Sequence, residues 1–471
     1  MSTPSEFSRR KFLHQAAAAG AAGAATPYFV PASALGKGPR GGANDRIQLG
    51  LIGAGGMGRA NLRNCTKYPD VVVTAIADPW KTRRDAAIAD YQGKPKPYAD
   101  YRELLAQKDV DAVIIATPQH WHCLTAVDAC EAGKDLYLQK PMTLHVAESL
   151  AVKRAVAKHQ RVCQVGTQIH ASENYRRVVE IVRCGNLGKI SVARSFLRMN
   201  QGTEGIGNPP KSEPPRDLDW NLWVGPAPMQ PFREAIVGAG PGGGWKKMSF
   251  ADYRGGWTAG MAPHILDLAF WALNPGFPTC TCASGGRHVL RDAGDAPDTH
   301  EVLWRFPNLT ITWMMSLVSS YAFDLRGGVG DDGVKWRGGQ GSSEMRWWLG
   351  TYFHGVNGTL YSDYERYAIV PEGNRMQSAK PPQERIPPSP GHEREWLDCL
   401  RTRRQPSCNA DDHSKIDVAI ALANLSLKLG RSIRFDPATE KIVGDEEAAR
   451  LAKPEYRDPW RFPSQYLEGA A

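Results

Sequence analysis

Short apolar runs alternate with amphipathic stretches over the first third of the chain. The runs cover residues 47–52, 71–77, 112–116, 135–138 and 162–165. Between them, apolar residues recur at helical spacing. Strands and helices that alternate in this way predict a parallel sheet with helices on both faces. We therefore expect an α/β domain with a doubly wound parallel sheet, a Rossmann fold, over residues 47–168.

The pattern changes after Gln168. Strand-like runs follow a helical segment, and residues 201–260 are dense in Gly, Pro and Trp. That segment is too long for a plain connection, which indicates either a functional loop or an elaborated insertion. We predict a C-terminal α/β domain over residues 169–436, with a large open, mainly antiparallel sheet, and an extended C-terminal tail over residues 437–471.

The N-terminus has the order of an export signal. Arg9 and Arg10 precede a run rich in Ala and Gly, and Ala32-Ser33-Ala34 follows it. This order predicts a twin-arginine signal peptide over residues 1–34, a linker over 35–46 and a periplasmic protein. A disordered basic N-terminus is the alternative. No run of 18 apolar residues occurs, so we expect no membrane contact in the mature form.

Composition narrows the partners and cofactors. The chain has 471 residues, enough for two or three domains, and its net charge of +9 is spread along it. Dispersed positive charge of this size is typical of a solvated surface, so we expect no nucleic acid partner. The nine cysteines show neither a CxxC pair nor a Cys/His zinc spacing, so we expect no metal site.

A glycine motif follows the first apolar run and precedes a predicted helix. Gly53, Gly55 and Gly58 match G-x-G-x-x-G, a pattern that allows a tight turn, close backbone approach to a pyrophosphate and close packing of helix on strand. The helix N-terminus would favour the phosphates. Gly56 and Met57 belong to the same loop, which we expect to bind a dinucleotide.

An acidic residue completes the dinucleotide pattern. Asp78 ends the second apolar run, 20 residues after Gly58. A carboxylate at this spacing accepts hydrogen bonds from the ribose hydroxyls and repels a 2′-phosphate. We therefore expect NAD rather than NADP, although Lys81, Arg83 and Arg84 lie close enough to weaken the preference.

Three further motifs carry a family resemblance. The order GAGGMG, ATPQHWH, LQKPMT and PHILD resembles the glucose–fructose oxidoreductase/inositol dehydrogenase/rhizopine catabolism (Gfo/Idh/MocA) family, over about residues 47–435. The twin-arginine start and the stretch WNLWVGPAP resemble its exported bacterial branch. The resemblance implies an NAD-dependent oxidoreductase acting on a secondary alcohol of a sugar or cyclitol, and pairing into a homo-dimer or homo-tetramer.

The resemblance also assigns roles to individual residues. It implies that Lys140 hydrogen-bonds the substrate hydroxyl and that His264 is the general base. Asp267 follows His264 by three residues, which places both on one helix face and lets them converge on the substrate. The remaining cofactor-binding residues implied by the motifs are Thr117, Pro118, His122 and Gln139.

Two positions depart from the family pattern. Gln139 stands where the family has a glutamate, and Gly260 where it often has an aspartate. With fewer carboxylates, the pKa values of Lys140 and His264 should be lower than in a carboxylate-rich site. The departures are compatible with catalysis, with a changed reaction or with a lost one.

The substrate side leaves alternatives open. Tryptophans crowd the region before and within the His264 helix, where their rings could stack on sugars or pack in a core; they are Trp220, Trp223, Trp245, Trp257 and Trp271. One alternative to a dehydrogenase is a glycosidase or lyase that uses a tightly bound NAD for transient oxidation of a glycoside. Another is a carbohydrate-binding relative without turnover.

Overall fold

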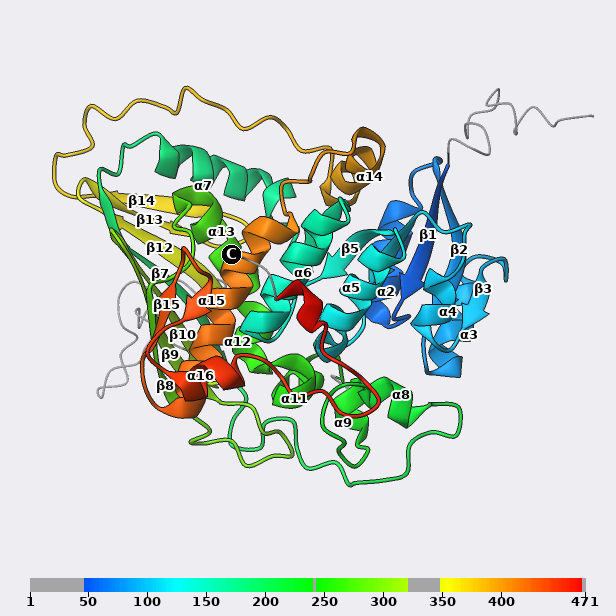
Figure 1. Ribbon diagram of the computed structural model, residues 1–471. Helices are drawn as coiled ribbons and strands as arrows, with labels where there is room; N and C mark the ends of the chain where they lie inside the picture. Colours follow the sequence, from blue (N-terminus) through cyan, green and yellow to red (C-terminus); the bar gives the residue numbers. More distant parts are fainter. Residues whose placement is uncertain (1–45, 240–242, 321–347, 468–471) are drawn as a thin grey trace, which may run out of the picture. The chain divides into compact units, whose positions relative to one another are not determined.

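The computed structural model describes residues 46–239, 243–320 and 348–467 (Figure 1). The predicted signal peptide and all of the linker except Arg46 lie outside these residues. The chain divides into two units, residues 1–47 with 68–71 and residues 48–67 with 72–471. Nearly all of the secondary structure lies in the second unit.

A six-stranded parallel sheet with the order β3-β2-β1-β4-β5-β6 forms the first half of the fold. Its strands are β1 (Ile47–Ile52), β2 (Val71–Ala77), β3 (Lys96–Tyr98), β4 (Ala112–Ile115), β5 (Asp135–Gln139) and β6 (Cys163–Gly166). Its helices are α2 (Gly56–Cys65), α3 (Lys81–Ala89), α4 (Tyr101–Leu105), α5 (His122–Glu131) and α6 (Val146–Lys158). The doubly wound prediction is confirmed. The strand order reverses between β1 and β4, which opens a crevice beyond their carboxyl ends.

The second sheet is larger and mixed. Its strands follow the order β14-β13-β12-β7-β10-β9-β8-β15-β16, with β11 beside β7. Only β10 and β7 pair in parallel among the described pairings of this sheet, so the mainly antiparallel prediction is confirmed. The strands are β7 (Ile190–Asn200), β8 (Cys280–Gly286), β9 (Thr299–Phe306), β10 (Leu309–Ser316), β11 (Val318–Ser319), β12 (Leu349–Gly355), β13 (Gly358–Ser362), β14 (Tyr367–Pro371), β15 (Ile433–Asp436) and β16 (Lys441–Ile442).

One face of this sheet is covered by helices. Along β9, Val302, Trp304 and Phe306 are buried while Leu303 and the other alternate residues are exposed, as the two-residue period of a half-covered strand requires. The buried face packs against α7 (Glu173–Arg183), α13 (Pro263–Leu273) and α15 (Ala410–Leu429), and Figure 1 shows α13 and α15 beside it. The indole Nε1 of Trp304 donates to the Ala419 carbonyl at 2.7 Å, which joins the sheet to α15.

The Gly/Pro/Trp-rich segment is an insertion made of short helices. These are α8 (Trp220–Val224), α9 (Glu234–Val237), α10 (Gly243–Lys246), α11 (Ala251–Arg254) and α12 (Gly256–Met261). The insertion has its own core, which includes Trp223, Phe232 and Tyr253. The indole Nε1 of Trp121, in the loop after β4, donates to the Trp223 carbonyl at 2.9 Å. The insertion therefore forms a wall beside the nucleotide-binding sheet.

The end of the chain is not the extended tail that the sequence suggested. After α14 (His392–Thr402) and α15, the chain forms β16 and then α16 (Glu446–Leu451). The side chain of Asp445 caps the N-terminus of α16 by accepting a hydrogen bond from the Ala448 N–H. The Trp460 ring packs edge-to-face on Trp121, with centroids 4.7 Å apart. Burial of these apolar residues folds the segment back onto the protein, an effect that local pattern does not report.

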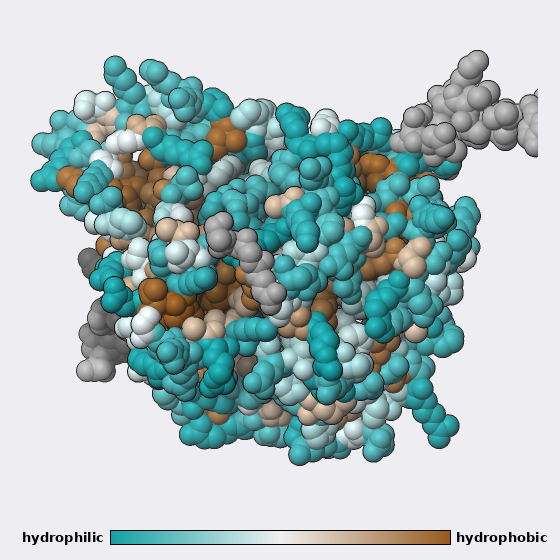
Figure 2. Space-filling model, viewed as in Figure 1, coloured by the Kyte–Doolittle hydropathy of each residue, from teal (hydrophilic) through white to brown (hydrophobic). Residues whose placement is uncertain are grey.

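The described residues include no helix long and apolar enough to cross a membrane. Figure 2 shows a face on which hydrophilic residues predominate, with smaller hydrophobic areas between them.

Candidate functional site

A cavity of about 790 Å³ lies at the carboxyl ends of β1, β2, β4 and β5, beside the insertion and the start of α13. This is the crevice that the strand order predicts. All but one of the residues proposed from the sequence for the cofactor and the chemistry line it or support its walls. Asp267, described below, is the exception in position.

The glycine loop forms one end of the cavity. Gly53 has φ +93°, and a Cβ there would lie 2.7 Å from the backbone of Ala116 and Thr117. A Cβ on Gly58 would lie 2.1 Å from the Gly53 carbonyl oxygen. A Cβ on Gly55 or Gly56 would instead meet nothing within 4 Å. Gly53 and Gly58 thus allow loop, strand and helix to pack closely. Gly55 and Gly56 leave open space in front of the loop, as a bound pyrophosphate requires.

Helix α2 begins in this loop and offers free donors to the cavity. Its first i→i−4 bond runs from the Arg59 N–H to the Gly55 carbonyl, so the preceding N–H groups have no acceptor of that kind. Met57, which is 53% exposed, lines the cavity beside them. Free N–H groups and the positive helix end together favour an anion such as a dinucleotide phosphate.

Asp78 lies at the end of β2, where the spacing placed it, but its carboxylate already has two partners. Oδ2 accepts from the Ala54 N–H at 2.7 Å and Oδ1 from the Trp80 N–H at 2.8 Å. Burial raises the pKa of Asp78, since desolvation outweighs these bonds and the nearby Arg83 and Arg84. Asp78 therefore fixes the shape of the glycine loop, whether or not it also meets a ribose.

The loop after β4 brings Thr117, Pro118 and His122 to the cavity. The His122 ring lies between two carbonyls, with Nδ1 2.8 Å from Pro141 O and Nε2 3.1 Å from Thr117 O. Burial lowers the pKa of His122 to about 4, so the ring is neutral and donates its single N–H to one of these two carbonyls. Thr117 Oγ1 is buried without a partner in the described part of the chain, a hydroxyl that a bound cofactor could satisfy.

Lys140 follows β5 and reaches across the cavity to the insertion. Its Nζ donates to the Gly260 carbonyl at 2.7 Å. Burial, with a contribution from the positive charge of Arg254, lowers the pKa of Lys140 to about 7. Gln139, which replaces the family glutamate, donates from Nε2 to Asn61 Oδ1 at 2.8 Å. The partner of Lys140 is thus a backbone carbonyl, and no carboxylate of the described residues pairs with the lysine.

His264 lies in the first turn of α13 and lines the same cavity. Burial and the charge of Lys140 hold its pKa well below the usual value, against the opposing effect of Asp267. The imidazole is therefore neutral near pH 7, and its Nδ1 is buried without a partner among the described residues. A neutral imidazole can accept a proton. Burial is the main cause of the low pKa of both Lys140 and His264.

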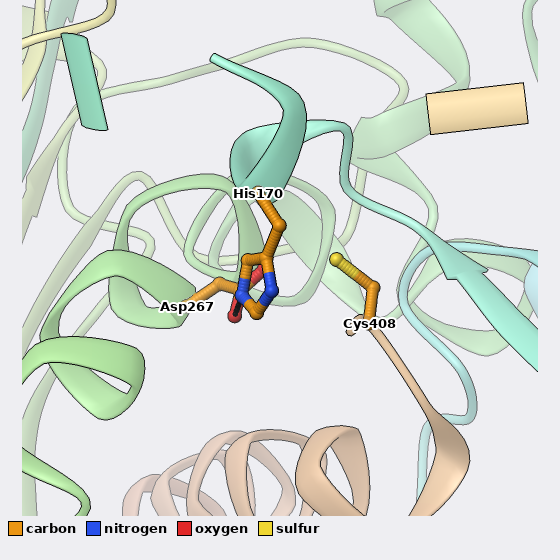
Figure 3. A group of neighbouring side chains, drawn as sticks. All are labelled: His170, Asp267 and Cys408. Carbon is orange, nitrogen blue, oxygen red and sulfur yellow. Dashed lines mark hydrogen bonds and ion pairs between the residues drawn. The ribbon is translucent and has the colours of Figure 1, made fainter. Parts of the chain in front are cut away.

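Asp267 does not converge with His264 on the cavity. It is 3% exposed and is not among the lining residues. Its Oδ2 accepts from Thr167 Oγ1 at 2.7 Å, and its Oδ1 lies 3.1 Å from His170 Nε2 (Figure 3). His413 Nε2 lies 3.5 Å from Oδ2. Two residues three positions apart lie on the same helix face only approximately. Here His264 faces the cavity, whereas Asp267 faces α15.

The partners of Asp267 form a buried charged network. Burial favours the neutral carboxyl, but His170 and His413 outweigh it and hold the pKa of Asp267 well below its usual range. Burial likewise opposes a charge on His413, yet Asp267 raises the pKa of His413 to about 10. Asp267 therefore supports the helix that carries His264 and does not touch a substrate.

This network also contains a set of groups that could hold a metal. Ligand atoms of His170, Asp267 and Cys408 lie within 4.8 Å of one another, and Figure 3 shows them coming from three separate segments. The sequence has no metal spacing because these segments are far apart along the chain. Both Asp267 oxygens already accept hydrogen bonds, whereas Nδ1 of His170 and Nδ1 of His413 are buried without a partner among the described residues.

Sequence reasoning missed two cations in the cavity. Arg254, at the end of α11, donates from NH1 to Gln119 Oε1 at 2.6 Å. Lys247, which directly follows α10, lines the cavity close to it. Both come from the insertion, 10 and 17 residues before His264, and that position was the only available signal.

Most of the proposed sugar-stacking tryptophans are packed away. Trp223 and Trp257 are buried, and the Trp271 ring stacks on His170 at 3.9 Å. Trp220 stacks on Trp223 at 4.9 Å. Trp245 differs, because it is 51% exposed, lines the cavity and is supported from behind by Trp257. It is the one of the five that offers a free aromatic face.

Comparisons with known families agree with this architecture. A family model described as "Oxidoreductase family, NAD-binding Rossmann fold" (GFO_IDH_MocA) matches residues 47–167. A second, described as "Oxidoreductase family, C-terminal alpha/beta domain" (GFO_IDH_MocA_C2), matches residues 343–462.

Individual relatives are more distant. A glycosyl hydrolase family 109 protein of Shewanella baltica is 30% identical over 202 residues, which cover 39% of this chain and 44% of the relative. The uncharacterized oxidoreductase YrbE of Bacillus subtilis is 31% identical over 143 residues, covering 30% and 42%. The matches thus span less than half the length of these curated relatives.

Solved structures share the fold. The WlbA dehydrogenase of Bordetella pertussis, solved with NADH and UDP-GlcNAcA, matches with a TM-score of 0.57 and 16% identity, covering 83% of this chain and 99% of that one. The myo-inositol 2-dehydrogenase of Lactobacillus plantarum matches with a TM-score of 0.55 and 16% identity, covering 83% and 100%. At these identities the likeness concerns the fold.

Proposed function

Because the chain belongs to the Gfo/Idh/MocA oxidoreductase family, we propose that it is an NAD-dependent oxidoreductase that acts on a secondary alcohol of a sugar or cyclitol. The observation that carries this proposal is the presence of Lys140, His264 and the glycine loop on one cavity. The loop holds a dinucleotide at one end, and the two basic side chains face the other.

The chemistry follows from the two basic groups. The bound dinucleotide supplies the hydride acceptor for the carbinol carbon. Lys140 binds the substrate oxygen, and its low pKa lets it alternate between amine and ammonium near neutral pH. His264, which is neutral, takes the hydroxyl proton at a ring nitrogen. His264 therefore serves as the base for oxidation and as the acid for the reverse reaction, while Lys140 holds the substrate oxygen.

The cofactor is held by this chain's own backbone and one acidic side chain. The free N–H groups of the glycine loop and of the start of α2 bind the pyrophosphate. Asp78 stands at the ribose end, and its buried carboxylate disfavours a 2′-phosphate, which makes NAD the preferred cofactor. The orphan hydroxyl of Thr117 gives the nicotinamide end a hydrogen-bonding group.

A second candidate is a glycosidase or lyase that uses a permanently bound NAD. It is favoured by the family 109 glycosyl hydrolases among the relatives. Transient oxidation of a carbinol would acidify the neighbouring C–H bond and allow elimination of the glycosidic alcohol, which leaves a C=C bond. A glycosidase would then add water to this bond, a lyase would not, and return of the hydride would restore the oxidised carbinol. The same residues serve both reactions, so the readout must be net redox change against bond cleavage. A binding protein without turnover is the third candidate.

The deciding experiment begins with the cofactor. The protein is purified without added nucleotide and denatured, and the released NAD(H) and NADP(H) are quantified. Stoichiometric NAD supports the proposal, and a panel of sugars, cyclitols and glycosides is then assayed for NADH formation and for cleavage. Absence of bound nucleotide, together with no binding of added NAD or NADP, would overturn it.

Export and assembly complete the proposal. The twin-arginine route carries folded proteins, so a protein exported this way could take its NAD from the cytoplasm. Changing Arg9 and Arg10 to Lys should retain the protein in the cytoplasm, and unchanged periplasmic yield would contradict the export signal.

The exposed face of the large sheet, which includes Leu303, is the surface on which we expect a homo-dimer or homo-tetramer to form.

A further inference from the structure

The cavity carries an excess of positive charge at its catalytic end. Asp78 is the one carboxylate among the described residues that line it. Of the lining cations, Arg59 is paired with Asp90 at 2.8 Å, and Arg83 lies beside Asp78. The other three are Lys140, Lys247 and Arg254, and no ion pair joins any of them to an acidic group in the described part of the chain.

These three cations repel one another. The charge of Arg254, followed by burial and by the charges of Arg83 and Lys140, lowers the pKa of Lys247 to about 6. Burial and the charge of Arg83 lower the pKa of Arg254 to about 9. With a pKa of about 6, Lys247 is mostly uncharged near pH 7, and an anion bound between these groups would favour their protonated forms.

The hydrogen bonds of these groups leave donors free. Arg254 gives NH1 to the neutral Gln119, and its Nε is buried without a partner in the described structure. The side-chain ammonium of Lys247 makes no hydrogen bond with another of the described residues. A buried guanidinium with an unmet N–H group is a strong site for a bidentate anion such as a carboxylate or a phosphate.

We propose that the substrate of this enzyme carries an anionic group, a carboxylate or a phosphate, and that Arg254 and Lys247 bind it while Lys140 and His264 act on the alcohol. This inference rests on the proposed function and narrows its substrate to acidic sugars, such as uronic acids and sugar phosphates.

The cofactor's own phosphates do not account for these cations. The pyrophosphate has its donors in the glycine loop and at the start of α2. Of the cations that line the cavity, Arg83 is the one whose charge acts on Asp78, at the ribose end. Arg254 contacts Gln119, and its charge interacts both with Arg83 and with Lys140, so it lies between the ribose end and the catalytic end.

The surroundings of Lys140 point the same way. Gln139 is a neutral amide that accepts from the Lys140 N–H, and Gly260 binds the lysine through its carbonyl. An anionic substrate would therefore meet little repulsion there, and the cations have no competing acidic partners among the described residues.

The test compares matched substrates on the protein loaded with NAD. The pairs are methyl β-D-glucuronide against its uronamide, D-galacturonate against D-galactose, and D-glucose 6-phosphate against D-glucose. Calorimetric affinity and turnover are measured for each at fixed ionic strength. We expect the acidic member of at least one pair to bind ten-fold or more tightly, and its advantage to shrink as salt rises. The carboxylate and phosphate pairs distinguish the two sources of the anion.

Two variants assign the effect to residues. Arg254→Gln and Lys247→Gln should each lower the preference for the acidic member about ten-fold or more. Lys246→Gln is the matched control, since Lys246 adjoins Lys247 but does not line the cavity. NAD content is measured in every variant. If the variants lose NAD or NADP and keep their sugar preference, the cations serve the cofactor and the inference is overturned.

The remaining outcomes separate the two proposals. Equal or better binding and turnover of the neutral members would overturn the inference and leave the oxidoreductase proposal standing. Tight binding of acidic sugars without redox change or cleavage would support the inference and overturn the proposed reaction. Binding of no sugar at all would overturn both.

Discussion

Lys140 Nζ donates a 2.7 Å hydrogen bond to the main-chain carbonyl of Gly260, at the position where relatives often carry an aspartate. The lysine thus keeps a fixed direction but loses a neutralising partner. Because the pair joins the nucleotide-binding sheet to the helix before His264, it positions one basic group relative to the other. Its consequences for charge can be tested.

Replacing Lys140 by Ala should lower kcat about 10²–10⁴-fold, the usual contribution of a positioned acid/base group. Its side chain faces the catalytic end of the cavity, so the bound NAD should remain. Turnover and nucleotide content of the purified variant check both points. Lys94→Ala, on an exposed lysine, is the control. Activity within a few-fold of wild type would remove Lys140 from the chemistry.

Restoring a carboxylate at Gly260 should move the pH profile. The pKa of Lys140 is about 7, so we expect kcat/KM for oxidation to rise with pH through about 7, because loss of the ammonium charge lets His264 take the hydroxyl proton more readily. A carboxylate beside the ammonium raises that pKa, and Gly260→Asp should move the rise to higher pH. A side chain there would meet the flexible Met248. Gly260→Asn matches it in size without charge, and an equal shift in both variants would contradict the electrostatic explanation.

Asp267→Asn should destabilise the protein without emptying the cofactor site. Removing the charge between His170 and His413 breaks a buried ion pair, a change that typically costs about 3–5 kcal/mol. Asp90→Asn, on the partly exposed pair with Arg59, should cost less than about 1 kcal/mol. Urea unfolding and NAD content measure the two effects. Lost turnover at full stability would return Asp267 to the catalytic residues.

The pH dependence of that difference has a definite sign. The folded pKa of Asp267 is depressed, so its contribution is present above the ordinary carboxyl value and is lost as pH falls through the folded value. The pKa of His413 is raised to about 10, so its contribution is full below about 6.5 and is lost as pH rises through about 10. The gap in Tm between wild type and Asp267→Asn should therefore be widest at pH 5–6 and should narrow toward pH 10. A gap independent of pH would contradict the charged network.

Asp78→Ala should weaken NAD binding and reduce the preference over NADP. The change removes the negative charge from the ribose end and frees the N–H groups of Ala54 and Trp80, which loosens the glycine loop. Titration of the nucleotide-free protein with both cofactors gives the two affinities. Asp78→Asn separates the effects, because it retains one acceptor for the loop without the charge. Unchanged affinity and preference in both variants would remove Asp78 from the cofactor site.

Local sequence was sufficient for the first sheet and its glycine loop. A strand, a turn that only Gly53 can adopt and a helix start are determined by residues within a dozen positions of one another, and Asp78 follows at a spacing set by one strand–helix unit. The larger sheet was also predictable as a class, because its strands alternate buried and exposed residues. The segment after Asp436 was not, since its helix is short and depends on long-range burial of Trp460.

Only the tertiary structure decided what surrounds the chemistry. The i+3 spacing from His264 to Asp267 was visible in the sequence, but packing against α15 gave Asp267 the partners Thr167, His170 and His413. No local sequence pattern marks Lys247 and Arg254, because their proposed role depends on the lack of acidic side chains around them in the folded protein. The electrostatic environment of a residue is the sum over neighbours that folding brings together. The sequence therefore shows which residues are basic, but it does not show which of them have no acidic partner.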